Sequence, residues 1–241
     1  MRIFAVHAPP MNILLLHGAL GTKRQMANLA DSLDHATCRS ITFTGHGESE
    51  IPQQGLNFEL FLRDVDLALE KVNGPVHLVG YSMGGYVALL WAAAHPHRVA
   101  SVCAIGSKLI WSSEGLQQEL KKMDPAAMEE KVPEFAMGLA ATHGIDRWKQ
   151  LVTATAAEMT RIAGMPLLTD EVLAKIECPV LLAVGDQDTT AIPEDMLAVS
   201  RKLKDAGVLV IPRTRHPFED IDLDLLITQL TRFWESTAEE E

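Results

Sequence analysis

The sequence predicts an α/β fold, a doubly wound and mostly parallel sheet with a helical insertion, and three observations support this prediction. Short apolar segments of strand length alternate with helical patterns along most of the chain. A glycine-rich turn joins the third of these strands directly to the next helix. More than 70 residues separate the fourth strand from the fifth, and they show helical patterns only. Parallel strands that are joined by helical crossovers form a right-handed, doubly wound sheet.

Six segments are expected to be strands because they are short and mostly apolar on both faces, as in a parallel sheet that helices cover. They are residues 12–16, 38–43, 75–80, 99–105, 180–184 and 208–211. Helical patterns between them predict helices at 23–33, 57–72, 83–95 and 193–204, with a closing helix near 219–235.

The connection between residues 105 and 179 is far longer than the dozen or so residues that a parallel crossover needs. It contains helical patterns at 115–123, 125–141, 146–162 and 169–176. We therefore expect a core domain of residues 1–106 and 178–241 and a helical cap, or lid, of residues 107–177. Five of the ten methionines lie in the cap, where they either line an adaptable apolar pocket or pack the helices together.

Composition argues against several classes of protein. The formal charge is −11, from 21 basic and 32 acidic residues, whereas nucleic-acid binding rests on clustered Lys and Arg. No apolar run approaches the ~20 residues that cross a bilayer, and the start of the chain lacks a signal-segment pattern. Cys38, Cys103 and Cys178 are widely spaced, as in a reducing compartment. We expect a cytoplasmic protein that binds neither nucleic acid nor membrane; its oligomeric state has no signature in the sequence.

The segment GYSMGG at 80–85 carries the chemistry, because it matches the G-x-S-x-G nucleophile elbow. An apolar strand precedes it and an Ala- and Leu-rich helix follows it. Such a tight turn strains the backbone at the serine, and Gly80 and Gly84 remove side chains that would collide there. The sequence therefore predicts that Ser82 is a nucleophile at the N-terminus of a helix.

A serine hydroxyl is a weak nucleophile and needs a base that an acid orients. In a doubly wound sheet both come from loops at the carboxyl ends of strands. The segment GDQD at 185–188 follows one strand and offers Asp186 and Asp188. His216 follows the last strand, so the chain order is serine, acid, histidine, as the motif requires. The residues alone leave open which aspartate is the acid.

Metal and cofactor chemistry has little support in the sequence. The segment HPH at 95–97 closes a predicted helix but has no carboxylate beside it, and neither HExxH nor CxxC occurs. We expect no metal and no cofactor.

In order and spacing these segments resemble the motifs of the α/β-hydrolase family, over nearly the whole chain. HGA at 17–19 resembles the family's oxyanion segment, and GHGES at 45–49 resembles its GHGxS loop. VGDQD at 184–188 resembles the stretch that ends in the triad acid, and HPFE at 216–219 the region of the triad histidine. The chain departs from the family at TFT 42–44, where DLP is common, and at Arg215, where Gly is frequent.

The resemblance implies a triad of Ser82, His216 and Asp188, with Asp188 as the acid. It also implies an oxyanion hole made by the backbone N–H groups of Ala19 and Met83. The activity that follows is hydrolysis of a small to medium, moderately apolar carboxylic ester or thioester through an acyl-enzyme. The expected partner is thus a small-molecule acyl substrate.

Three other functions use the same fold. A menaquinone-pathway lyase, which eliminates pyruvate, carries Arg directly after the elbow's two glycines, where this chain has Tyr86. Its anionic substrate would also need cations, whereas the cap's Lys and Arg residues share helical stretches with Asp and Glu, as on a solvated face. A carbon–carbon bond hydrolase also uses this triad. A non-catalytic binding protein would not need an intact triad.

Overall fold

The computed structural model describes residues 11–33 and 36–238, so the predicted core domain extends beyond the described residues at both ends. Six strands form one sheet in the order β2-β1-β3-β4-β5-β6, and every neighbouring pair is parallel. The predicted fold class is confirmed. The strands are β1 (Asn12–Leu16), β2 (Thr37–Ile41), β3 (Val76–Tyr81), β4 (Val99–Ile105), β5 (Val180–Gly185) and β6 (Ala206–Ile211).

The strand order reverses direction between β1 and β3. From β1 the chain passes outward to β2 and then returns to pair β3 on the other side of β1. Loops that leave neighbouring strands in opposite directions open a crevice at the carboxyl ends, which is where ligands bind in such sheets. The loops after β1 and β3 contain Ala19 and Ser82, so the topology brings these two residues to the same crevice.

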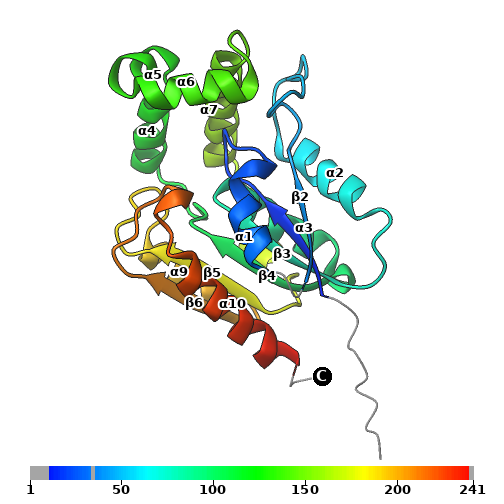
Figure 1. Ribbon diagram of the computed structural model, residues 1–241. Helices are drawn as coiled ribbons and strands as arrows, with labels where there is room; N and C mark the ends of the chain where they lie inside the picture. The colour runs from blue at the N-terminus through cyan, green and yellow to red at the C-terminus, as the bar shows by residue number, and fades with distance from the viewer. Residues whose placement is uncertain (1–10, 34–35, 239–241) are drawn as a thin grey trace, which may run out of the picture.

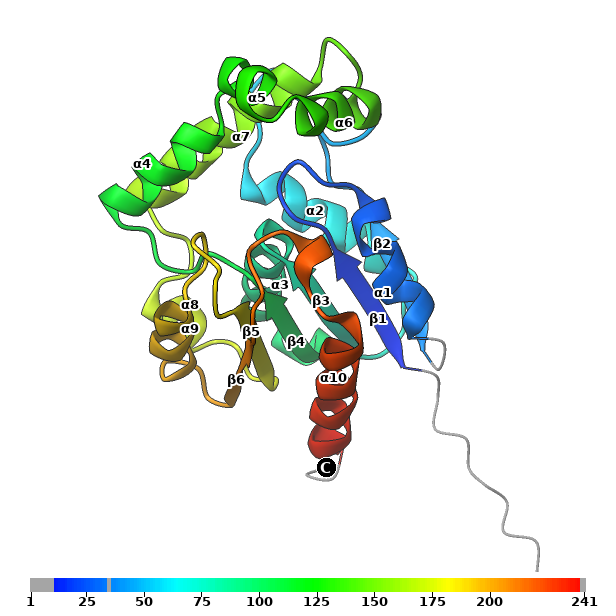
Figure 2. The same ribbon diagram turned by 60° about the vertical axis from the view of Figure 1, so that its left-hand side comes forward.

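Helices cover both faces of the sheet (Figures 1 and 2). α1 (Ala27–Ser32) and α10 (Leu223–Ala238) lie on one face, and α2 (Phe58–Leu69), α3 (Met83–Ala94) and α9 (Pro193–Ser200) lie on the other. Within β1, Leu14 faces one core and Ile13 the other, because successive strand residues point to opposite faces. This burial on both faces explains the apolar strand segments of the sequence.

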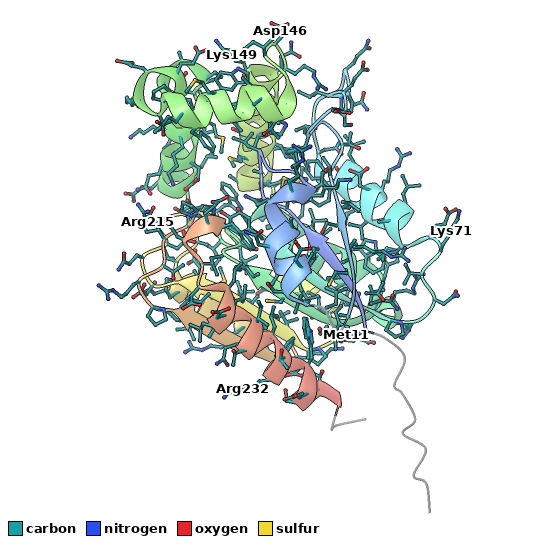
Figure 3. All side chains as sticks on the ribbon, viewed as in Figure 1. Met11, Lys71, Asp146, Lys149, Arg215 and Arg232 are labelled. Carbon is teal, nitrogen blue, oxygen red and sulfur yellow. The ribbon has the colours of Figure 1, made fainter. Side chains whose placement is uncertain are left out.

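The residues between β4 and β5 form five helices. They are α4 (Ser113–Lys122), α5 (Pro125–Lys131), α6 (Pro133–His143), α7 (Trp148–Gly164) and α8 (Asp170–Leu173). Helices α4–α7 lie beyond the carboxyl ends of the strands, whereas α8 packs against α3 (Figure 2). In Figure 3, Asp146 and Lys149 mark the outer end of this group of helices, and Arg215 lies between the group and the sheet.

The structure differs from the sequence prediction at several element boundaries. The single helix predicted at 125–141 is two helices, because Pro133 has no N–H to donate and disfavours helical backbone at Val132, where φ is −138° and ψ is 60°. The closing helix begins at Leu223 rather than 219, after a 3₁₀ turn at Phe218–Asp220. The helix predicted at 23–33 begins with a 3₁₀ turn at Lys23–Met26.

Among the described residues, no helix combines the length and the apolar character that crossing a bilayer requires.

Candidate active site

Ser82 lies at a sharp turn between β3 and α3. Its φ of 51° and ψ of −114° are strained for a residue with a side chain. The turn is held because the Ser82 N–H donates to the Ile105 carbonyl at 2.7 Å and the Ser107 hydroxyl donates to the Ser82 carbonyl at 2.9 Å. A Cβ at Gly80 would collide with the backbone of Gly84, and a Cβ at Gly84 would collide with the Leu16 carbonyl, which explains the two glycines of the motif. The turn thus holds the serine at the carboxyl edge of the sheet.

Ser82, His216 and Asp188 come together from the loops after β3, β6 and β5. The Ser82 Oγ lies 3.3 Å from the His216 Nε2, and the His216 Nδ1 lies 2.8 Å from the Asp188 Oδ2. An ionised carboxylate only accepts hydrogen bonds, so the Nδ1 carries the proton and the Nε2 lone pair faces the hydroxyl. Such a hydroxyl–imidazole contact is often long without substrate and tightens when substrate binds.

The two candidate acids have different surroundings. Asp188 is 5% exposed, and its Oδ1 accepts hydrogen bonds from the backbone N–H groups of Thr190 at 2.8 Å and Ala191 at 2.9 Å. Asp186 is exposed, and its Oδ1 accepts from the Thr214 N–H at 3.1 Å. Of the two, Asp188 is the one that contacts His216, and its second oxygen is fixed by the loop.

Two backbone donors lie beside the serine. Ala19 and Met83 line the same cavity as Ser82. Within residues 11–33 and 36–238, neither of their N–H groups donates to a protein acceptor. The loop that carries Ala19 is fixed because the Gly18 N–H donates to the Gln25 Oε1 at 2.9 Å. The arrangement can therefore offer two N–H groups to a developing oxyanion without first breaking a protein hydrogen bond.

Buried histidines hold the loops around this site. The His17 Nε2 accepts from the Phe43 N–H at 3.0 Å. His143, on α6, accepts from the Gly47 N–H at its Nδ1 and donates from its Nε2 to the Leu20 carbonyl, both at 2.8 Å. Burial lowers the pKa of His17 to about 4 and also lowers the pKa of His143. Both rings therefore act as neutral donors and acceptors at neutral pH.

Two cavities meet at Ser82. The inner chamber is the smaller of the two and has mainly apolar walls, which include Leu56, Phe58, Phe61 and Ile162. The outer cleft is larger and also contains His216. Of the five methionines in the predicted cap, three line this cleft, namely Met123, Met128 and Met159, whereas Met137 and Met165 are exposed. A reacting bond at Ser82 would thus have one substituent on each side.

Comparison with known proteins identifies the family of this chain. The sequence profile described as "Alpha/beta hydrolase family" matches residues 13–222. This chain belongs to the alpha/beta hydrolase family. The family predicted from the motifs is therefore confirmed.

The curated relatives have several activities. This chain is 26% identical over 235 residues to the pimeloyl-acyl carrier protein methyl ester esterase of Neisseria meningitidis, covering 86% of each chain. It is 35% identical over 85 residues to the putative 2-succinyl-6-hydroxy-2,4-cyclohexadiene-1-carboxylate synthase of Haemophilus influenzae, covering 34% of each chain. The matches to the first curated relatives span only 28–34% of those proteins.

A solved structure confirms the fold over nearly the whole chain. The putative lipase of Acinetobacter baumannii superimposes with a TM-score of 0.80 and 20% identity, covering 96% of this chain and 86% of the lipase.

Two supporting contacts at the candidate site were absent from the sequence prediction. The Tyr81 hydroxyl donates to the His216 carbonyl at 2.8 Å and so fixes the histidine loop. His143 reaches Leu20 and Gly47 from far along the chain. Tyr81 occupies a variable position of the motif and His143 has no local partner, so no sequence signal marks either residue.

Four of the cap's cations bind other groups of the protein, although Lys122 itself is exposed, as expected for a solvated face. The Lys122 Nζ pairs with Glu119 at 3.0 Å, and the Arg161 Nε pairs with Glu158 at 2.7 Å. Both of these carboxylates are buried. The other two cations donate to backbone carbonyls, Lys108 to that of Thr190 and Arg147 to those of the loop at 47–49. These cations join the helices to one another and to the core.

Proposed function

We propose that this hydrolase cleaves a small to medium, moderately apolar carboxylic ester or thioester through an acyl-enzyme on Ser82. The observation that carries the proposal is the hydrogen-bonded series of Ser82, His216 and Asp188 where the inner chamber meets the outer cleft.

In the proposed mechanism, the Ser82 hydroxyl attacks the substrate carbonyl while the His216 Nε2 takes its proton. Asp188 keeps the Nδ1 proton in place and stabilises the imidazolium that forms. The negative charge on the carbonyl oxygen accepts hydrogen bonds from the N–H groups of Ala19 and Met83. His216 then gives its proton to the leaving alkoxide or thiolate, and afterwards activates a water molecule that releases the acid from Ser82.

The two cavities favour a division of the substrate. The apolar walls of the inner chamber suit the acyl group, because burial of each CH₂ contributes about 0.8 kcal/mol. The larger outer cleft suits the leaving group, and methionine side chains adapt to varied shapes. In this proposal residues 107–177 form a cap that contributes to the walls of both cavities. The chain is a cytoplasmic enzyme that needs no cofactor.

The test is a panel of p-nitrophenyl esters and acyl thioesters of increasing chain length, with Ser82→Ala as the control. We expect turnover of short to medium chains that Ser82→Ala removes. Turnover of none of the compounds by the wild type, or equal turnover by the variant, would contradict the proposal. Release of an acid from a carbon–carbon substrate but not from esters would favour a carbon–carbon bond hydrolase.

A second candidate is the pyruvate-eliminating lyase, which the similarity to the Haemophilus synthase favours. That reaction needs cations for a multiply anionic substrate. The cations at the cavity walls are Lys108, Lys122 and Arg215. Lys122 is paired with Glu119 and Arg215 with Asp220, whereas Lys108 donates to the Thr190 carbonyl. We therefore expect no pyruvate release from the menaquinone precursor, as followed with a coupled lactate dehydrogenase assay. Pyruvate release together with no ester turnover would establish the lyase instead.

A further inference from the structure

Glu119 is a buried carboxylate at the point where the two cavities meet. It is 4% exposed and, like Ser82, lines both the inner chamber and the outer cleft. Its Oε1 accepts a hydrogen bond from the Lys122 Nζ at 3.0 Å, whereas its Oε2 accepts none within residues 11–33 and 36–238. The Oε2 is also absent from the fully buried polar atoms without a partner, so it keeps accessible surface. Glu119 therefore offers an unpaired oxygen where the cavities meet.

Glu158, the other carboxylate of the inner chamber, provides an internal comparison. Its Oε1 accepts from the Phe58 N–H at 3.1 Å and from the Arg161 Nη2 at 2.8 Å, and its Oε2 accepts from the Arg161 Nε at 2.7 Å. Both oxygens of Glu158 thus have partners, and the residue joins α7 to the start of α2. Buried carboxylates usually have such a complete set of partners. The open oxygen of Glu119 therefore needs a different explanation.

Lys122 supplies a hydrogen-bond donor next to this carboxylate. Its Nζ also donates to the Thr190 Oγ1 at 2.8 Å, and its side chain lines the outer cleft. An ammonium group has three N–H donors, so the bonds to Glu119 and Thr190 leave one donor over. Among the described residues, the pair of Glu119 and Lys122 thus has one acceptor and one donor that no protein group occupies.

We propose that Glu119 and Lys122 bind a hydroxyl group of the leaving group, so that hydroxyalkyl esters are the preferred substrates. This inference rests on the proposed function, which assigns the leaving group to the outer cleft. A hydroxyl both donates and accepts, so one oxygen can donate to the Glu119 Oε2 and accept from the Lys122 Nζ. Lys122 would repel an ammonium group on the substrate and Glu119 would repel a carboxylate, which makes an uncharged group the best match.

An ester without this hydroxyl leaves the Glu119 carboxylate incompletely hydrogen-bonded. Its leaving group would cover the Oε2 and displace water from it without replacing the hydrogen bond. Sites with polar groups placed for a substrate hydroxyl reject the analogue that lacks it for this reason. Lys122 is exposed and keeps its contact with solvent, so Glu119 should account for most of the discrimination.

The experiment compares two matched pairs of hexanoate esters, 2-hydroxyethyl with 2-methoxyethyl and 3-hydroxypropyl with 3-methoxypropyl. The ether oxygen still accepts from Lys122 but cannot donate to Glu119, so each pair isolates the hydrogen bond to the carboxylate. Acid release is followed in a pH-stat, and each kcat/KM is divided by the rate of base hydrolysis of the same ester. We expect the wild type to prefer the hydroxy ester of at least one pair by about tenfold.

Glu119→Gln tests the role of the carboxylate. The glutamine keeps an oxygen for Lys122 but places an NH₂ group where the Oε2 was, and this group cannot accept the hydroxyl proton. The variant should lower the preference by roughly three- to tenfold, whereas exclusion of the methoxy group by its size alone would persist. Glu114→Gln is the matched control, because Glu114 is exposed on the same helix and lines neither cavity, and it should leave the preference unchanged.

Three results would overturn the inference. They are equal values within both wild-type pairs, a preference that a folded Glu119→Gln retains in full, and turnover of p-nitrophenyl esters without turnover of any of these four esters. Turnover of neither kind of ester by the wild type would contradict the proposed function itself. The two failures are therefore distinguishable.

Discussion

Replacing Asp188 by Asn changes the proton that His216 carries. The Asp188 Oδ1 accepts from the N–H groups of Thr190 and Ala191, so the oxygen of an asparagine would remain there. Its NH₂ group would then occupy the position of Oδ2, 2.8 Å from the His216 Nδ1. Two donors cannot share that contact, so the Nδ1 would lose its proton and the Nε2 would carry one. A protonated Nε2 cannot accept the proton of Ser82.

The expected cost is large. Replacing the acid of such a triad by its amide lowers kcat by about 10⁴-fold, which corresponds to about 5.5 kcal/mol of transition-state stabilisation. Asp186→Asn is the matched control, because Asp186 is exposed and an asparagine oxygen still accepts from the Thr214 N–H. Its effect on kcat should stay within about twofold, as for most surface substitutions.

The assay measures kcat and kcat/KM for both variants on the best p-nitrophenyl ester of the panel, and the unfolding temperature checks that each variant is folded. A larger loss in Asp186→Asn than in Asp188→Asn would show that the assignment at GDQD is shifted by two residues. A loss of less than tenfold in a folded Asp188→Asn would refute the tautomer argument.

Two further predictions concern stability. Gly80→Ala should leave little folded protein, because the added Cβ would collide with the Gly84 backbone. Gly138→Ala is the control, since its Cβ meets open space within α6, and it should raise the free energy of unfolding by about 0.5–1 kcal/mol. A soluble and active Gly80→Ala enzyme would contradict the predicted collision. Because burial lowers the pKa of His17 to about 4, the unfolded chain binds more protons than the folded one between about pH 6.5 and pH 4. The contribution of His17 to the free energy of unfolding is complete above pH 6.5, and about 3 kcal/mol of it should be lost as the pH falls from 6.5 to 4. Urea unfolding at pH 7 and pH 4.5 measures the loss, which His17→Gln should reduce and exposed His97→Gln should not; an identical pH slope in His17→Gln would contradict the argument.

The fold was largely predictable because its signals are local. The apolar strands are short and buried on both faces, and the strained backbone at Ser82 needs Gly80 beside it whatever the rest of the chain does. The helix break before Pro133 could have been predicted from the sequence, because proline has no N–H to donate within a helix. It was missed because the helical pattern of apolar residues continues across 125–141.

The candidate site was predictable only in part. Chain order and the position after a strand restricted the acid to Asp186 or Asp188, and the residues alone could not separate them, because both follow the same strand. The family resemblance selected Asp188. The folded loop gives the physical reason, because it brings the Asp188 carboxylate to His216. The contact of His143 with Leu20 joins residues 123 positions apart, so no local pattern announces it.

The central claim is that Ser82 is the nucleophile. Incubation with a fluorophosphonate, followed by peptide mass spectrometry, measures this directly, because the reagent forms a stable bond with a serine that a base activates. The account predicts a single adduct, on Ser82, with loss of ester turnover in proportion to labelling and no adduct in Ser82→Ala. An adduct on another residue, or full turnover by a labelled enzyme, would contradict it.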